Sequence, residues 1–138
     1  MPASEPDDAP GMLRRLTPFL PAVLWAAIVW VIGGLDSTPR VSTDLPLDKV
    51  AHFTMYGILG WLIGRAWFAE PHRSPWILPL LLPLMLGAAD ELRQRSIGTR
   101  SADVADWVAD AAGAAAGMLV ALRTRRAHPL PMTRHGDE

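Results

Sequence analysis

The chain has 138 residues and a formal net charge of −1, so it fits one small domain, and its near-neutral balance argues against nucleic acid as a partner. It contains no cysteine, which excludes disulfides, thiolate catalysis and thiolate metal sites. Its charges are distributed unevenly: four apolar stretches hold 76 residues but only five of the 27 charged side chains. These stretches are residues 16–35, 50–68, 75–92 and 104–122. A water-soluble helix of this length carries a charged outer face, which none of the four has.

The length of the stretches indicates helices that cross a bilayer. Each has 18 to 20 residues, and about 20 helical residues span the roughly 30 Å hydrocarbon core. We therefore predict an all-α, polytopic membrane protein, a four-transmembrane-helix bundle over residues 14–126. Residues 1–13 and 127–138 are polar and contain prolines, which predicts disordered tails.

The distribution of arginine and lysine predicts the orientation of this bundle. With four spans, both termini lie on the same side of the membrane. If that side is the cytoplasm, it carries eight Lys and Arg residues, against five on the outside. Positively charged loops stay inside, so we predict that both termini are cytoplasmic.

Ionisable residues gather at the end of the bundle predicted to face outward. The second stretch begins at such residues, the third ends in them and the fourth follows them, so span alternation brings all three groups to one membrane face. The candidate cluster consists of Asp48, Lys49, His52, Tyr56, Glu91, Gln94, Arg100, Asp106 and Asp110.

Helical spacing predicts which faces meet, because residues three or four apart lie on one side of a helix. Asp48, His52 and Tyr56 form one row, which continues to Gly60. In the fourth stretch Asp106 and Asp110 share a stripe with Gly113 and Gly117, a small-x-x-x-small pattern that lets helix backbones approach closely. The polar ends and the small residues thus point the same way. We expect Gly60, Gly113 and Gly117 to pack the bundle beneath the polar cluster.

Burial cost constrains Asp110 in particular, because it lies two turns inside the fourth stretch. An ionised Asp at the centre of a membrane helix costs about 2.5–3.5 kcal/mol on translocon scales. We therefore expect Asp110 to face the bundle, with His52, Arg100 and Lys49 as candidate partners.

These residues in this order resemble the VanZ-like family of bacterial integral membrane proteins. The resemblance lies in Asp48-Lys49-x-x-His52-Phe53-x-x-Tyr56, Glu91-x-x-Gln94, Arg100, and Asp106-x-x-x-Asp110-x-x-Gly113-x-x-x-Gly117. Many members have Asn where this chain has Asp110. The resemblance implies a multi-pass protein of the bacterial cytoplasmic membrane. The family takes its name from a member associated with resistance to teicoplanin, a lipid-bearing glycopeptide antibiotic, but the resemblance supplies no reaction.

Four interpretations of the cluster stay open at this point. It is a structural network in which Lys49 or Arg100 bridges carboxylates, or it binds an envelope lipid, a wall precursor or an amphiphilic antibiotic. It is catalytic, with His52 as the general acid or base oriented by Asp48 or Glu91, and Arg100 stabilising an anionic intermediate. Or it holds a metal through His52, Glu91, Asp106 and Asp110, although no H-E-x-x-H spacing is present.

We favour the second interpretation: the outward-facing cluster binds or processes a cell-envelope amphiphile, and the lipid bilayer is the other partner. His52, Glu91, Arg100 and Asp106 are the central candidates. The alternative is a structural or partner-binding membrane module. We expect no metal and no cofactor.

Overall fold

The computed structural model describes residue 11 and residues 15–34, 47–69, 77–97 and 104–127. In this part of the chain all regular structure is helical. A short 3₁₀ turn, η1 (Thr17–Phe19), leads into α2 (Leu20–Gly33), and three longer helices follow. These are α3 (Leu47–Phe68), α4 (Ile77–Ile97) and α5 (Val104–Ala127). The predictions of an all-α chain and of four helices are confirmed, whereas almost all of the two predicted tails lies outside the described residues.

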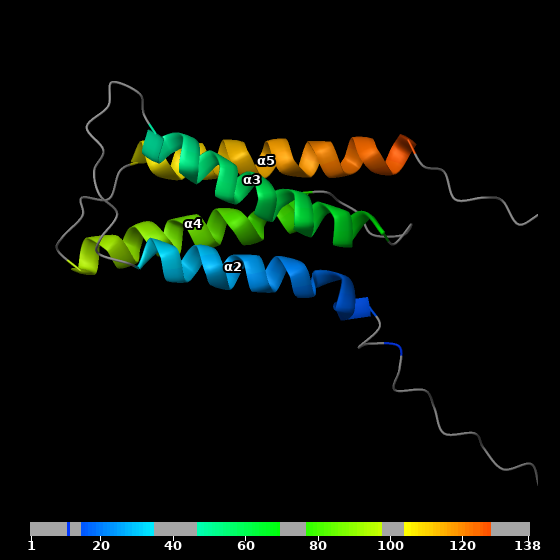
Figure 1. The fold of residues 1–138 in the computed structure, drawn as a ribbon, viewed down its shortest axis with the longest axis horizontal. Helices are drawn as coiled ribbons and strands as arrows, with labels where there is room; N and C mark the ends of the chain where they lie inside the picture. The colour runs from blue at the N-terminus through cyan, green and yellow to red at the C-terminus, as the bar shows by residue number, and fades with distance from the viewer. Residues whose placement is uncertain (1–10, 12–14, 35–46, 70–76, 98–103, 128–138) are drawn as a thin grey trace, which may run out of the picture.

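The four helices run up and down along one long axis (Figure 1). As a result, the last turns of α2 and α4 lie at the same end as the first turns of α3 and α5, on the left of the figure. All the described aspartates and the one described glutamate lie near this end of their helices, on α3, α4 and α5. The alternation expected from the sequence therefore places their helix ends together.

Glycines bring α3 and α5 into direct backbone contact. A Cβ added at Gly60 of α3 would collide with the carbonyl of Ala114 in α5, and one added at Gly113 would collide with the carbonyl of Phe53. A Cβ at Gly117 would lie 2.8 Å from the Trp61 backbone nitrogen, closer than van der Waals contact allows. The three glycines expected to pack the bundle all lie at this contact.

Two prolines of α4 lie inside the bundle rather than on its surface. Pro79 and Pro83 are among the most completely buried side chains. Pro79 falls in the first turn, where a missing N–H costs nothing, but Pro83 lies within the helix and cannot donate to the carbonyl of Pro79. The face of α4 that carries these two prolines therefore packs against the neighbouring helices.

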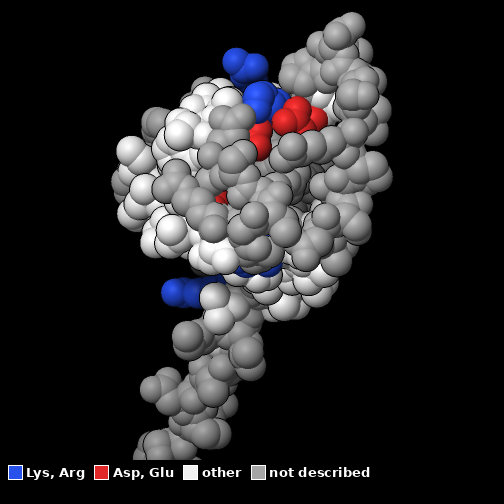
Figure 2. All heavy atoms as spheres, turned by 90° about the vertical axis from the view of Figure 1, so that its left-hand side faces the viewer, with Lys and Arg blue, Asp and Glu red and all other residues white. Residues whose placement is uncertain are grey.

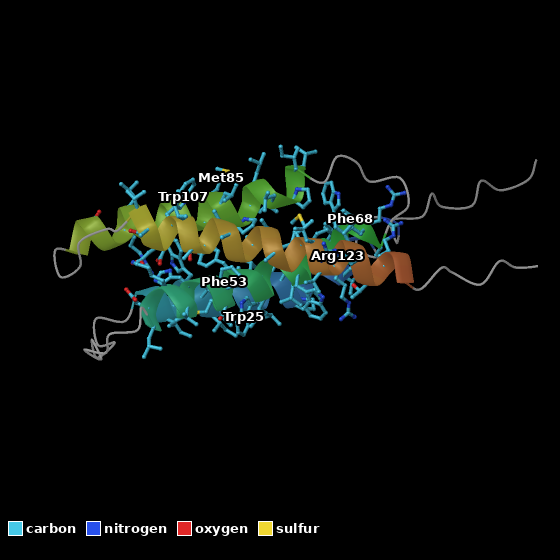
Figure 3. The ribbon with its side chains drawn as sticks, turned by 90° about the horizontal axis from the view of Figure 1, so that it is seen from above. Trp25, Phe53, Phe68, Met85, Trp107 and Arg123 are labelled. Atoms are coloured by element: carbon cyan, nitrogen blue, oxygen red, sulfur yellow. The ribbon has the colours of Figure 1, made fainter. Side chains whose placement is uncertain are left out.

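The bundle exposes many large apolar side chains on its surface, and its mainly apolar core also contains a few polar residues. Large apolar side chains are exposed on all four helices, for example Leu24, Phe53, Met85 and Val104. Figure 3 shows Met85 directed away from the other helices. The buried polar residues, by contrast, are His52, Asp90, Glu91 and Asp110.

By length and composition, one helix in the described part of the chain is apolar enough to cross a membrane, over Val104–Arg125. The apolar helix Thr17–Gly33 is shorter, and α3 and α4 carry charged residues at one end or both. The structure therefore confirms the number of helices predicted from the sequence but shows only one clear candidate span.

Candidate functional site

The candidate site is the polar end of the bundle. We define the polar cluster as four buried polar residues, the Tyr56 hydroxyl, and three charged residues at the rim; its members are His52, Asp90, Glu91, Asp110, Tyr56, Lys49, Arg93 and Asp106. Figure 2 looks onto this end and shows positive and negative side chains close together among uncharged ones. In Figure 3 side-chain oxygen and nitrogen atoms gather at the same end between α3 and α5.

A hydrogen bond between His52 and Asp110 forms the centre of the cluster. His52 Nδ1 lies 2.9 Å from Asp110 Oδ1, and both side chains are buried. When Asp110 is ionised its carboxylate only accepts, and the ring then donates from Nδ1. On the far side of Asp110, a Cβ added at Gly87 of α4 would lie 3.0 Å from Oδ2. The bare backbone at Gly87 thus lets this carboxylate fit between α3 and α4.

Lys49 joins α3 to α5 at the rim of the cluster. Its Nζ donates to Asp106 Oδ1 over 2.8 Å and lies 3.8 Å from Asp48 Oδ2. The Asp48 side chain is half exposed, whereas the Asp106 side chain is mostly covered. An exposed pair such as Lys49–Asp48 contributes little to stability, so Asp106 is the more important partner.

A second ion pair, Asp90–Arg93, lies within α4, and its arginine also contacts α2. Arg93 Nη2 bonds to Asp90 Oδ1 and also donates to the Trp30 carbonyl over 2.8 Å. The guanidinium lies 4.2 Å from the centre of the Trp30 ring. Trp30 belongs to the last turn of α2, where carbonyls have no partner within the helix, so Arg93 caps that end. A Cβ at Gly33 would lie 2.6 Å from Asp90 Oδ2, so a larger residue there would require the Asp90 carboxylate to shift.

Tyr56 lies one helical turn deeper than His52 on the same face of α3. Only 1% of its surface is exposed, and its hydroxyl has no hydrogen-bond partner among the described residues. The carboxylates of Asp110, Asp90 and Glu91 lie within electrostatic range of it. Leaving a buried hydroxyl without a partner costs about 1–3 kcal/mol, so this position calls for an explanation.

The VanZ/LLP1 family profile matches residues 11–125, which is most of the chain and includes α2, α3, α4 and all but the last two residues of α5. The chain belongs to the VanZ/LLP1 family. No curated protein matches it, and no solved structure does. The resemblance to VanZ-like proteins drawn from the motifs is confirmed over a longer stretch than the motifs cover.

Within this VanZ/LLP1 chain, the structure brings together four of the predicted site residues as two pairs, His52 with Asp110 and Lys49 with Asp106. The catalytic interpretation expected Asp48 or Glu91 to orient the His52 ring. In the structure, the carboxylate at His52 Nδ1 is that of Asp110. Glu91 is buried in α4. Arg100 and the side chain of Gln94 lie outside the described residues.

Two members of the VanZ/LLP1 polar cluster, Asp90 and Arg93, were not among the candidates from the sequence. Their i,i+3 spacing on α4 is a signal for an ion pair. Nothing in the sequence of α2 indicates that Arg93 contacts it, because the acceptor is a backbone carbonyl and every residue has one.

The described residues contain no group of three or more His, Cys, Asp or Glu arranged to hold a metal ion. On α5, Asp110 bonds to His52 and Asp106 bonds to Lys49. What the cluster offers is a set of buried hydrogen-bonding groups at the polar end of the bundle.

Proposed function

We propose that this VanZ/LLP1 protein is a four-span protein of the bacterial cytoplasmic membrane, with both termini in the cytoplasm, and that its polar cluster binds the head group of a cell-envelope amphiphile. Envelope lipids, wall precursors and lipoglycopeptide antibiotics such as teicoplanin are the ligand classes that combine a polar head group with an acyl chain.

The polarity of the bundle supports insertion of all four helices. Exposed apolar side chains occur on each of them, including Val23, Val50, Leu82 and Leu119. A water-soluble protein rarely exposes so large an apolar surface, whereas lipid tails solvate it. At about 1.5 Å per residue, α3, α4 and α5 are each about 31–36 Å long, which matches the bilayer core.

One observation supports ligand binding over a purely structural network: the buried Tyr56 hydroxyl has no hydrogen-bond partner in the part of the chain that the structure describes. A network whose only role is to fix helix packing satisfies its buried members, because each unsatisfied group destabilises the fold. A binding site leaves a group ready for its ligand. The Tyr56 hydroxyl lies within electrostatic range of the carboxylates of Glu91 and Asp110, so a ligand that reaches it would also feel their charge.

Replacing Glu91 in a complementation experiment tests this proposal. A deletion strain is complemented by the wild type or by Glu91→Gln, which keeps the side-chain shape, and its envelope lipids and antibiotic susceptibility are measured. Glu70→Gln, which removes the same charge from the segment after α3, is the matched control. We expect Glu91→Gln to reach normal abundance without restoring the wild-type profile, and Glu70→Gln to restore it. Loss of folded Glu91→Gln protein would instead favour the structural alternative, and full complementation would exclude Glu91 from the site.

A further inference from the structure

The buried part of the polar cluster is acidic. Three of its four buried polar residues are carboxylates, Asp90, Glu91 and Asp110, and the fourth is His52. The two cations lie at the rim and are more exposed than their partners: the exposed side-chain fraction is 34% for Lys49 and 23% for Arg93. Each already bonds to an aspartate. A ligand that reaches the interior therefore meets negative charge.

This acidic character persists when the connecting segments are counted. Residues 36–49 and 90–110 together contain eight Asp and Glu against five Lys and Arg. The described charged residues at the opposite helix ends are all arginines, for example Arg65 and Arg123. The polar end thus attracts cations, and the field favours a positively charged group over an anionic one.

Tyr56 supplies a second observation that points to a ligand. Its hydroxyl lies within electrostatic range of all three buried carboxylates, is 99% buried, and has no partner among the described residues. A tyrosine hydroxyl can accept a hydrogen bond as well as donate one. A positively charged N–H donor can therefore bond to the Tyr56 oxygen while the buried carboxylates attract its charge.

We propose that the polar cluster binds a protonated primary amine, carried on the head group of an aminophospholipid or a similar aminated amphiphile. This inference rests on the proposed function and specifies its ligand. An ammonium group has three N–H donors and one positive charge, which match the Tyr56 oxygen and the surrounding carboxylates. A quaternary ammonium has the charge without the donors, and the head group of phosphatidylglycerol has hydroxyl donors without the positive charge.

Binding of three lipids with identical acyl chains tests the proposal. The full chain, purified in mild detergent, is titrated with phosphatidylethanolamine, phosphatidylcholine or phosphatidylglycerol, and the bound lipid is counted by native mass spectrometry. We expect phosphatidylethanolamine to bind about tenfold more tightly than either of the others, since a hydrogen bond to a charged group is worth about 1.5–3 kcal/mol.

A conservative pair of variants then assigns the effect to the site. Tyr56→Phe removes only the hydroxyl and should abolish most of the tenfold preference. Thr54→Val removes a hydroxyl from the same helix at an exposed position, where it bonds to the Val50 carbonyl, and should leave the preference unchanged. If Tyr56→Phe does not fold, the wild-type comparison of the three lipids still decides the question.

The outcomes separate this inference from the proposed function. Equal or tighter binding of phosphatidylglycerol that depends on Tyr56 would overturn the amine and leave the proposed function standing. If Tyr56→Phe weakens the binding of none of the lipids, both the amine and the proposed function are overturned. Soluble O-phosphoethanolamine has the same head group without acyl chains: competition as strong as that of the lipid would support the amine but overturn an amphiphile as its carrier.

Discussion

His52 Nδ1 lies 2.9 Å from Asp110 Oδ1, so one buried hydrogen bond connects α3 to α5 at the centre of the polar cluster. Asp110→Ala leaves the imidazole without this acceptor and should lower the free energy of unfolding by about 2 kcal/mol. Asp110→Asn keeps a side-chain oxygen that can accept from Nδ1, so its loss should stay below about 1 kcal/mol. Unfolding by a harsh detergent, followed by circular dichroism, measures both.

Asp48→Asn is the control for these variants. It also replaces a carboxylate of the predicted site by an amide, but its side chain is exposed and its ion pair with Lys49 is long, at 3.8 Å. Its effect on unfolding should be no more than about 0.5 kcal/mol. An Asp110→Ala variant as stable as Asp48→Asn would contradict the importance of the His52 bond.

The backbone contact between α3 and α5 predicts large effects of adding one methyl group. Gly60→Ala and Gly113→Ala would each push a Cβ into a carbonyl of the facing helix. Because backbone cannot move aside like a flexible side chain, we expect each to cost about 2–3 kcal/mol. The measurement is again detergent unfolding, combined with the yield of folded protein.

Gly57→Ala provides a control in the same helix and the same interface. A Cβ there would lie 3.5 Å from the Gly113 carbonyl, an ordinary van der Waals contact. Since alanine favours a helix over glycine by about 1 kcal/mol, this variant should be neutral or slightly stabilising. A similar loss for Gly57→Ala and Gly60→Ala would show that the close approach at Gly60 is not what limits packing.

Sequence periodicity predicted the faces of the helices well. The i,i+4 row from Asp48 through His52 to Tyr56 becomes steadily more buried along α3, and the stripe containing Asp110 and Gly113 faces that helix. These features depend on helix geometry alone, which the spacing fixes.

Which residues of neighbouring helices pair was harder to predict from the sequence, because pairing depends on the axial register and the crossing geometry of the helices. Three partners were open for Asp110, and only the structure selects His52. The contact of Arg93 with Trp30 could not be predicted either, since a backbone acceptor has no sequence signal. Likewise, only the structure shows that the Tyr56 hydroxyl has no partner among the described side chains.

Arg93 should stabilise the bundle through its contacts with α2. Arg93→Ala removes the Asp90 pair, the bond to the Trp30 carbonyl and the stacking on its ring, so we expect a loss of about 2–3 kcal/mol. Arg65→Ala is a matched control, because Arg65 is exposed and lies 5.7 Å from the centre of the Trp61 ring. It should cost less than about 1 kcal/mol. Equal losses would contradict a special role for Arg93.

Restoring part of the Arg93 interaction gives an independent check. Arg93→Lys keeps the charge near Asp90 but lacks the planar fork that bonds to two acceptors and stacks on an aromatic ring. Its stability should therefore lie between those of the wild type and Arg93→Ala. A lysine variant with full stability would show that charge alone accounts for the effect.

The proposed four-span topology predicts which segments face the outside of the cell. Because the chain has no cysteine, single cysteines give an unambiguous signal with a membrane-impermeant maleimide. Ser42→Cys and Ser101→Cys, from the two segments that flank the polar end, should be labelled on intact cells. Ser74→Cys, between α3 and α4, should be labelled only after the membrane is permeabilised. The reverse pattern would invert the orientation and place the polar cluster on the cytoplasmic side. Labelling of all three on intact cells would rule out a protein with four spans.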